Sequence, residues 1–468
     1  MWCVYNQVLK IFFFKSPSES IPPKSHKTRW LILAHGFNMD GRAASQIVTD
    51  KIPYFLEVGI KPIVFSAITG SKDERFPHKQ FLAWGPAAFR FDFRHWISNR
   101  YGRNWFYRLS TTTVSLLLAP FIALEKLLTG FSNQWSWALP AFVYGLKEIR
   151  NGEVDLIYSS GGAWSAHLAA FWLKNKTGLT WIAEIHDPLV LRQNRCDQGI
   201  KNFKSRDASF KYYLEQQICK HADFVWWFTD EALHFANVRN PHLNEGKIAR
   251  GLVVIPGAQP PKRNSLQGAG QYHYSHAKLN LSHFGSLSND RSLSTVLKAV
   301  IVLIKKYPEA QKYIIVNSFG SSLDHVSKFM IRHYSLEHLV KDHGRLEQDI
   351  ISGKTGRELA IEAMQSADIL ILLHGNAEWC AEYIPSKFYE YLFIGKPIWA
   401  ITNLNYQLDA MLQERGAYLS HSDNLESINF TLERIWLDWL KQKLIEPKYL
   451  PIGADQAANK ILSLVNSI

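Results

Sequence analysis

The chain has 468 residues, of which 47% are hydrophobic and 20% are charged. This length allows two or three domains with well-formed cores, and the composition excludes both a wholly disordered chain and a polytopic membrane protein. Lys and Arg number 53 against 41 Asp and Glu, a net charge of +12 that points to an anionic neighbour such as phosphates or acidic lipids. The four cysteines form no Cys-x-x-Cys pair, so we expect no structural metal and a cytoplasmic location.

Short apolar runs, each followed by a turn and a helical pattern, recur along the first half of the chain. Buried strands that alternate with helices are typical of a parallel sheet covered on both faces. We therefore expect a Rossmann-like domain over residues 28–258, after a leader (1–27) for which a position near a membrane is one interpretation. The predicted strands are residues 30–34, 61–65, 155–158, 181–185, 224–227 and 253–255.

The same alternation begins again after a linker, residues 259–278, that is rich in Gly, Gln, Ser and Lys. A second doubly wound domain is predicted over residues 279–440, and the tail, residues 441–468, is expected to be a helix that returns to the first domain. Two such α/β domains would face each other across a cleft, and ligands of open parallel sheets bind at the carboxyl ends of the strands. The predicted strands are residues 279–284, 313–316, 368–373 and 397–401.

A helix start in the second domain has the chemistry of a diphosphate site. The amides of Ser386, Lys387 and Phe388, with the Lys387 ammonium, can hold a diphosphate, because a helix N-terminus has unsatisfied N–H groups and a partial positive charge. Carboxylates would repel that group at contact. Glu382 before the helix and Glu390 within it are better placed to accept hydrogen bonds from hydroxyls, which fits a sugar at one end of the ligand and a ribose at the other.

The sequence around these two acids resembles a known donor site. Glu382 and Glu390 lie at the ends of Glu-Tyr-Ile-Pro-Ser-Lys-Phe-Tyr-Glu, and Gly-Lys-Pro follows at 395–397. The spacing resembles the signature of family 4 retaining glycosyltransferases, which have the two-domain GT-B fold. The resemblance covers most of the chain, with Gly41 in the first strand-to-helix loop and Gly285 in the first loop of the second domain.

The resemblance implies a role for each residue that matches the signature. Glu382 would contact the donor sugar as a catalytic residue, Glu390 would contact the ribose, and Arg291 with Lys387 would bind the diphosphate. Such enzymes use a nucleoside-diphosphate sugar and retain the anomeric configuration. They need no metal held by an Asp-x-Asp motif, and this chain has no two Asp residues with that spacing, so neither a metal nor another cofactor is expected.

One position departs from the family pattern. Family members commonly have an Arg directly after the glycine of the first loop in the second domain, whereas this chain has Ser286. We expect Lys387 and Arg345 to compensate for the missing cation, with Ser386 also in the donor site. Weaker donor binding or an inactive protein are the alternatives.

In the first domain, His186 and Asp187 directly follow a predicted strand and should lie at the edge of the sheet that faces the cleft. The resemblance implies that they contact the donor sugar or the acceptor hydroxyl, as catalytic residues. A neutral imidazole or a carboxylate there can accept or orient the acceptor's proton. A His-Asp-Pro turn that only caps the loop is the alternative interpretation.

Residues 72–108 combine positive charge with aromatic side chains, and basic residues outnumber acidic ones by eight to three. Such a surface can bind anionic lipid headgroups. The charge-free stretch between Arg108 and Glu125 contains Pro120 and is shorter than the ~20 residues that a spanning helix needs, so we expect it to lie on a bilayer rather than cross it. Alternatively, the rings fill the core. They are Phe81, Trp84, Phe89, Phe91, Phe93, Trp96, Trp105 and Phe106.

The resemblance implies a retaining glycosyltransferase of the hexosyltransferase type. It would move a sugar from a nucleotide-sugar donor to a glycan or a polyprenyl-linked acceptor in cell-surface polysaccharide biosynthesis, at the inner face of the cell membrane. Three alternatives remain: an inactive scaffold with the same fold, a GT-B epimerase or phosphorylase, and a basic protein that binds membranes or nucleic acid. No helix-turn-helix, zinc finger or RNA-recognition signature is present, so we expect no nucleic-acid partner.

Overall fold

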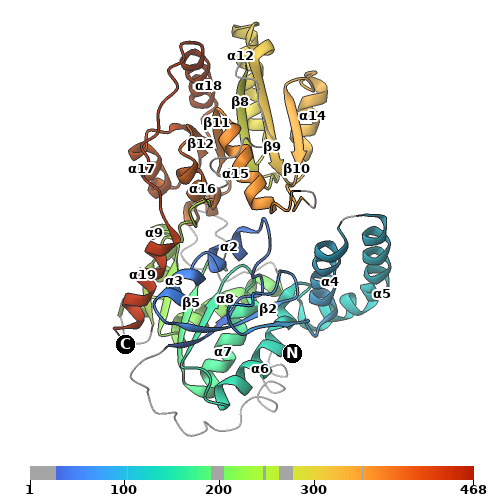
Figure 1. The fold of residues 1–468 in the computed structure, drawn as a ribbon, viewed down its shortest axis with the longest axis vertical. Helices are drawn as coiled ribbons and strands as arrows, with labels where there is room; N and C mark the ends of the chain where they lie inside the picture. The colour runs from blue at the N-terminus through green and yellow to red at the C-terminus, as the bar shows by residue number, and fades with distance from the viewer. Residues whose placement is uncertain are drawn as a thin grey trace.

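The computed structural model describes residues 28–102, 104–190, 205–245, 249–262, 278–349 and 352–467. The predicted leader and most of the predicted linker lie outside the described residues. Two α/β domains are stacked along the long axis of the molecule (Figure 1), each with one parallel sheet flanked by helices. The predicted fold class, two Rossmann-like domains, is therefore confirmed.

The N-terminal domain contains a seven-stranded sheet in the order β3-β2-β1-β4-β5-β6-β7, and every neighbouring pair is parallel. The direction in which strands are added reverses between β1 and β4, so the sheet has a switch point there. The strands are β1 (Arg29–Leu33), β2 (Lys61–Ala67), β3 (His78–Phe81), β4 (Leu156–Ser160), β5 (Thr180–Glu184), β6 (Phe224–Trp227) and β7 (Arg250–Val253).

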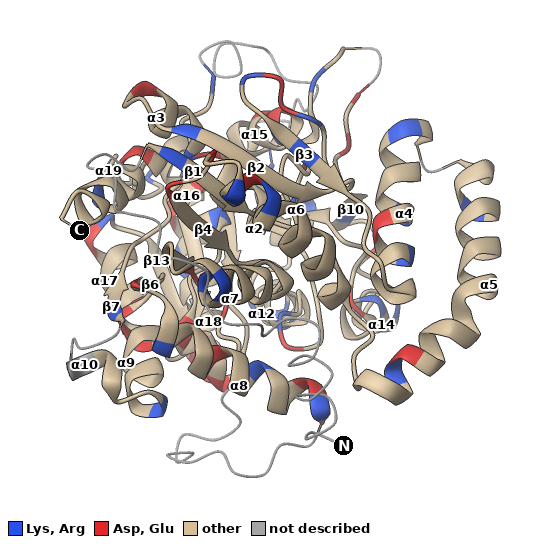
Figure 2. Ribbon diagram, turned by 90° about the horizontal axis from the view of Figure 1, so that it is seen from below, with Lys and Arg blue, Asp and Glu red and all other residues tan. Residues whose placement is uncertain are grey.

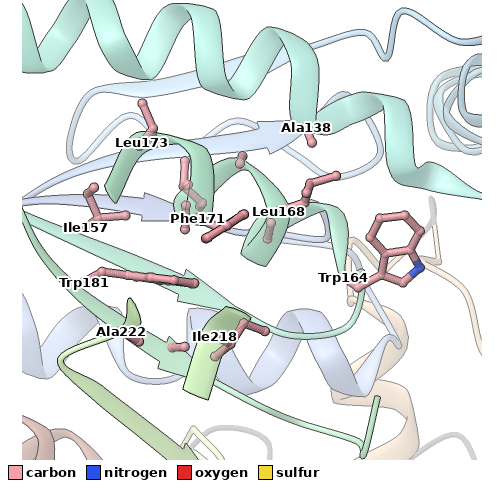
Figure 3. Close-up of a cluster of buried hydrophobic side chains, with 14 of the residues drawn as sticks. Ala138, Ile157, Trp164, Leu168, Phe171, Leu173, Trp181, Ile218 and Ala222 are labelled. Atoms are coloured by element: carbon pink, nitrogen blue, oxygen red, sulfur yellow. The ribbon is translucent and has the colours of Figure 1, made fainter. Parts of the chain in front are cut away.

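Successive strand residues point to opposite faces of this sheet, so each face has its own core. On one face Ile157 and Trp181 pack against Leu168 and Phe171 of α7 and Ile218 of α8 (Figure 3). The helices of the domain are α2 (Ala43–Thr49), α3 (Ile52–Glu57), α4 (Pro86–Tyr101), α5 (Trp105–Thr129), η1 (Gln134–Trp137), α6 (Ala138–Arg150), α7 (Ser165–Thr177), α8 (Arg206–His221), α9 (Asp230–Arg239) and α10 (His242–Glu245).

The C-terminal domain contains a six-stranded parallel sheet in the order β10-β9-β8-β11-β12-β13. Its strands are β8 (Leu279–Gly285), β9 (Ile314–Gly320), β10 (Val340–Gly344), β11 (Ile369–Leu373), β12 (Ile398–Thr402) and β13 (Tyr418–His421). Its helices are α12 (Ser294–Lys306), α13 (Ala310–Tyr313), α14 (His325–His333), α15 (Gly356–Ser366), η2 (Glu378–Glu382), α16 (Lys387–Ile394), α17 (Tyr406–Glu414) and α18 (Leu425–Leu440).

The last helix, α19 (Ala454–Val465), lies against the N-terminal domain, where a returning helix was expected. Its Ala458 and Ile461 share a buried cluster with Trp30 and Phe55. The amide of Ala454 donates to the carbonyl of Ala258 at 3.0 Å, so the two chain segments that connect the domains run side by side. The C-terminal domain is thereby joined to the N-terminal domain at both of its ends.

Helices α4 and α5 form a hairpin at the side of the N-terminal domain (Figures 1 and 2). Among the rings of residues 72–108, Trp84, Trp105 and Phe106 are exposed, whereas Phe81 packs on the core and stacks on Tyr144 with centroids 4.6 Å apart. Phe89, Phe91, Phe93 and Trp96 are half-buried. Part of the aromatic segment therefore packs inward.

Helix α5 is longer than its charge-free stretch suggests. It has 25 residues in all, with Pro120 inside it. Within the described part of the chain it is the one helix that is long and apolar enough, by length and composition alone, to cross a membrane. The expectation that this segment is too short for a span was therefore wrong on length, because the helix extends beyond the nearest charged residues at both ends.

Candidate functional site

A cavity of about 750 Å³ lies between the two domains. Its wall in the C-terminal domain is formed by the last residues of β8, β9 and β10, by the residues that follow these strands, and by the start of α15 and α16. Its wall in the N-terminal domain is formed by Gly41, Arg42 and Gln46. The carboxyl ends of parallel strands beside a switch point are where open α/β sheets bind ligands. Four residues predicted for the site line this cavity, namely Gly41, Gly285, Arg345 and Lys387.

Two glycines shape the floor of the cavity. Strands β8 and β9 end at Gly285 and Gly320, which have φ values of 148° and 142°. A Cβ atom on Gly320 would lie 1.9 Å from the carbonyl oxygen of Gly285, so no other residue fits there without moving the backbone. Beside them the ring of Phe319 stacks between Phe284 and His343, with centroids 4.7 Å and 4.2 Å away. The floor therefore combines closely approaching backbone with a flat aromatic surface.

Positive charge dominates the cavity. Arg42, Arg345, Arg357 and Lys387 line it, against the single carboxylate of Asp342 among the described residues. Such a wall attracts an anionic ligand, because charges of one sign that surround a cleft concentrate the opposite charge in it.

Lys387 and Arg357 both contact Glu390, the residue predicted to meet a ribose. The Lys387 ammonium forms a hydrogen-bonded ion pair with one carboxylate oxygen of Glu390, and Nε of Arg357 lies 3.4 Å from the other. Burial opposes ionisation of Glu390, but the two cations outweigh it and hold its pKa below the ordinary value. Glu390 itself does not line the cavity among the described residues, so it lies behind the two cations.

The start of α16 supplies fewer amides than the sequence predicted. The amide of Phe388 donates to the carbonyl of Pro385 at 2.9 Å, which uses the third of the three predicted donors inside the first turn. Ser386 is not among the described residues that line the cavity. The ammonium of Lys387 is therefore the group that α16 brings to the cavity wall.

The N-terminal domain binds directly to the start of α15. The carboxylate of Asp40 accepts the amides of Gly356 and Arg357 at 2.8 Å and 3.3 Å, and Asp50 forms a two-pronged ion pair with the Arg357 guanidinium at 2.8 Å and 3.0 Å. The Asp40 contact places a carboxylate at a helix N-terminus, where it is stabilised. Arg345 donates from Nη2 to the carbonyl of Gly41 at 3.3 Å. The loop after β1 and the C-terminal domain are thus linked at the cavity.

His186 lies above a buried polar network at the carboxyl ends of β4 and β5. The hydroxyl of Ser160 donates to Glu184 at 3.1 Å and accepts from Nε2 of His186 at 2.8 Å, and Glu184 is paired with the buried Lys51 ammonium at 2.7 Å. Burial lowers the pKa of His186 to about 4, so the ring is neutral at neutral pH. Because the single hydroxyl proton of Ser160 goes to Glu184, the neutral ring must donate to Ser160. This assigns the ring proton to Nε2 and leaves a lone pair on Nδ1.

Asp187 of the N-terminal domain lies within electrostatic range of Arg291 of the C-terminal domain. The side chain of Asp187 reaches solvent, but the protein atoms packed around it displace much of the surrounding water. This partial desolvation raises the pKa of Asp187, and the positive charge of Arg291 opposes the rise. Arg291 donates to the hydroxyl of Tyr383 at 2.5 Å and its guanidinium lies over the same ring. Neither residue lines the cavity, but they place an acid and a cation together beyond its edge.

In this conformation Glu382 is not placed to contact a sugar in the cavity. It is buried at the end of η2, its carbonyl accepts from the hydroxyl of Thr229 at 3.0 Å, and its charge acts on Arg239 of α9. These neighbours belong to the N-terminal domain on the side of α9. Glu382 therefore lies at the interface of the domains and does not line the cavity among the described residues.

The sequence analysis missed Arg357, Asp40 and Asp50, as well as the Lys51–Glu184 pair. No local spacing distinguishes them, because each pair joins segments far apart along the chain. The one available signal was that Asp40 and Asp50 flank the first strand-to-helix segment of the domain, next to the predicted Gly41. Within the described residues, no group of three or more His, Cys, Asp or Glu side chains is placed to hold a metal ion.

Solved structures share this architecture. The chain is similar to Anabaena HepE, solved in complex with UDP-glucose (TM-score 0.56, 12% identity, covering 95% of this chain and 100% of that one). It is also similar to the trehalose-6-phosphate synthase OtsA (TM-score 0.58, 12% identity, 94% and 99% covered) and to a UDP-forming α,α-trehalose-phosphate synthase from Burkholderia vietnamiensis (TM-score 0.56, 10% identity, 95% and 99% covered). At such identities the likeness shows the fold, two Rossmann-like domains around a cleft.

No protein-family model matches the chain, and no curated protein sequence matches it significantly.

Proposed function

We propose that this protein is a glycosyltransferase that takes a sugar from a nucleoside-diphosphate donor bound in the cavity between its domains. The observation that carries the proposal is the cavity itself, a space of about 750 Å³ at the carboxyl ends of β8, β9 and β10 with four cationic side chains and two bare glycine backbones. Its volume suits a nucleotide-sized ligand, and its charge suits a diphosphate. The predicted assignment to family 4 is part of this proposal.

Binding of the donor would replace the Lys387 ammonium by ribose hydroxyls as the partner of the Glu390 carboxylate. Without a ligand its carboxylate is paired with Lys387. The ribose hydroxyls of a donor would donate to that carboxylate, and the released Lys387 ammonium would meet the diphosphate at Gly285. The half-buried ring of His343, at one end of the stack that it forms with Phe319 and Phe284, offers a stacking partner for a base.

The sugar end of the donor would reach toward Arg291, Asp187 and His186, beyond the edge of the cavity. Lys387 and Arg291 would stabilise the charge that develops on the leaving diphosphate. The neutral His186 ring can accept a hydrogen bond at Nδ1 from a sugar or acceptor hydroxyl, since Ser160 holds the proton on Nε2. Retention of configuration and independence from metals belong to the proposal as further steps. A catalytic contact of Glu382 with the donor sugar would first require this residue to leave its buried position beside Thr229 and Arg239.

The acceptor that we propose is a glycan or a lipid-linked sugar in polysaccharide biosynthesis.

HepE was solved with UDP-glucose, and one trehalose-phosphate synthase with the same fold is described as UDP-forming. These ligands make uridine diphosphate and its sugars the first donors to test.

A thermal-shift panel of nucleoside diphosphates and their sugars tests the proposal. A ligand at a hundredfold excess over its Kd stabilises the folded state by about 2.7 kcal/mol, so the matching nucleotide should raise Tm by several degrees. Glu390→Ala should reduce this ligand-induced rise, measured against the variant's own Tm. Glu414→Ala, whose side chain is exposed on α17, is the matched control and should respond as the native protein does.

The possible outcomes separate two parts of the proposal. Equal stabilisation of the native protein and Glu390→Ala would refute the ribose contact. The absence of a response to every nucleoside diphosphate would refute the donor site, and would favour a scaffold that keeps the fold without the activity.

A further inference from the structure

Helix α5 exposes more apolar surface than a helix of a water-soluble domain normally does. Nine of the 27 large hydrophobic side chains that are exposed in the described residues belong to its 25 residues. Among them, Trp105, Leu116, Leu117, Leu127 and Leu128 are between 65% and 73% exposed. Single exposed apolar residues are ordinary, but a contiguous set along one helix indicates a surface that another apolar phase covers.

One side of α5 packs on the domain. The exposure of its other side is therefore not the result of a helix that has no packing partner. It lies along α4, and its Glu125 is buried, where the carboxylate accepts the amide of Ala87 at 2.9 Å and the indole N–H of Trp135 at 2.7 Å. Thr111 is buried on the same side. The attached side fixes the orientation of the helix, so its apolar side faces outward as a rigid surface.

The acidic side chains of the hairpin are buried, whereas its exposed charged side chains are basic. Its two acids, Asp92 on α4 and Glu125, are both buried, and Asp92 lies 3.2 Å from His35. The charged side chains that α4 and α5 expose within the described residues are cations, among them Arg94, Arg108 and Lys126. The charge-free stretch of α5 runs from Arg108 to Glu125, and Lys126 follows directly after that buried acid. Figure 2 shows the middle of the helix without charged residues.

We propose that the α4–α5 hairpin docks the protein on an anionic lipid surface, with α5 lying in the plane of the membrane interface. The leucines and Trp105 of its outer side enter the boundary between headgroups and acyl chains. Arg94, Arg108 and Lys126 bind lipid phosphates at that level. Exposed cations around an apolar face are the arrangement that binds acidic membranes.

The same contacts argue against α5 as a membrane span. A span would have to carry the neighbouring α4 with it, including Arg90, Asp92 and Arg94, or else break the α4–α5 packing. It would also remove Glu125 from the two donors that satisfy it on the domain. Docking in the interface keeps every one of these contacts. The inference is independent of nucleotide binding, since no residue of the hairpin lines the cavity.

Flotation of the purified full-length chain with lipid vesicles tests the inference. The native protein should float with vesicles of phosphatidylcholine and phosphatidylglycerol, less with phosphatidylcholine alone, and less as salt increases. Leu117→Glu with Leu128→Glu should lower the partition coefficient at least about tenfold, because it removes two inserting side chains and adds two negative charges.

The matched control is Phe329→Glu with Phe430→Glu, which changes two side chains of similar exposure (64% and 70%, against 67% and 65%) on the other domain. Both double variants replace exposed residues, so their Tm should stay near the native value, and the control should float like the native protein. Arg94→Gln with Lys126→Gln should weaken binding to anionic vesicles and reduce its salt dependence.

Two results would overturn the inference. One is equal flotation of the native protein and Leu117→Glu with Leu128→Glu. The other is a native protein that stays in solution with anionic vesicles and elutes as a dimer that the α5 substitutions convert to a monomer, since the apolar side would then be an interface between two copies of the chain.

Discussion

The close approach of the backbone in the cavity floor depends on Gly320. Its φ of 142° is a conformation that other residues rarely adopt, and a Cβ there would lie 1.9 Å from a backbone oxygen. We expect Gly320→Ala to lower the free energy of unfolding by about 3 kcal/mol, since both strain and overlap must be relieved. Gly59→Ala, also at positive φ but with nothing within 4 Å of the added Cβ, should cost about 1 kcal/mol. Urea unfolding of the two variants measures this difference, and equal losses would contradict it.

Only some of the residues that line the cavity could be predicted from the sequence. Lys387, Gly285, Arg345 and Gly41 were predicted and line the cavity. Arg357 was missed, although it pairs with Asp50 and lies 3.4 Å from Glu390. A motif lists residues near one another in sequence, whereas the ion pairs of Arg357 exist only because the fold brings α15 against the N-terminal domain.

The elements that sequence analysis missed are strands at the edges of the two sheets. The central strands were predicted because burial on both faces makes them continuous apolar runs, as in Ile-Leu-Ile-Leu-Leu of β11. In contrast, β3 reads His-Lys-Gln-Phe and β10 reads Val-Lys-Asp-His-Gly. Each of these lies at a sheet edge, as does β13. An edge strand pairs on one side and keeps polar side chains in solvent, so its local pattern resembles a loop.

The expectations for where two segments of the chain pack had different outcomes. The tail, residues 441–468, was expected to be a helix that returns to the first domain, and α19 does pack on the N-terminal domain. The aromatic segment that leads into α4 had two explanations, surface or core, and the structure divides it between them. Ring composition alone could not decide this, because Phe81 packs inward while Trp105 stays outside.

At the scale of the whole molecule, the stability should depend on pH through buried neutral histidines. Nε2 of His374 donates to the carbonyl of Tyr383 at 2.9 Å, and Nδ1 accepts the amide of Asn403 at 3.3 Å, so the neutral ring satisfies both neighbours. Burial lowers the pKa of His374 and of His283 from 6.5 to about 4. The unfolded chain therefore binds more protons than the folded protein between these two pH values.

The sign of the effect follows from that difference in bound protons. Stability from these histidines is fully present above about pH 6.5 and is lost as pH falls toward about 4, by up to roughly 1.4 kcal/mol per pH unit for each ring. The depressed pKa values of Glu184 and Glu390 start from 4.5, so the carboxylates act mainly below this window. Urea unfolding at a series of pH values should show a plateau above 6.5 and a steady fall below it. A constant free energy of unfolding down to about pH 5 would contradict the assignment.

The central claim is that the cationic wall between the domains binds the diphosphate of a nucleotide. Isothermal titration of the nucleoside diphosphate that stabilises the protein most, into the native chain, Lys387→Ala and Lys298→Ala, tests it directly. Lys298 is exposed on α12 and is not among the residues that line the cavity, so it controls for the loss of one charge. We predict that Lys387→Ala weakens Kd at least about tenfold, since a charge-assisted contact is lost, and that Lys298→Ala leaves it unchanged. The same Kd for all three proteins would contradict the donor site described above.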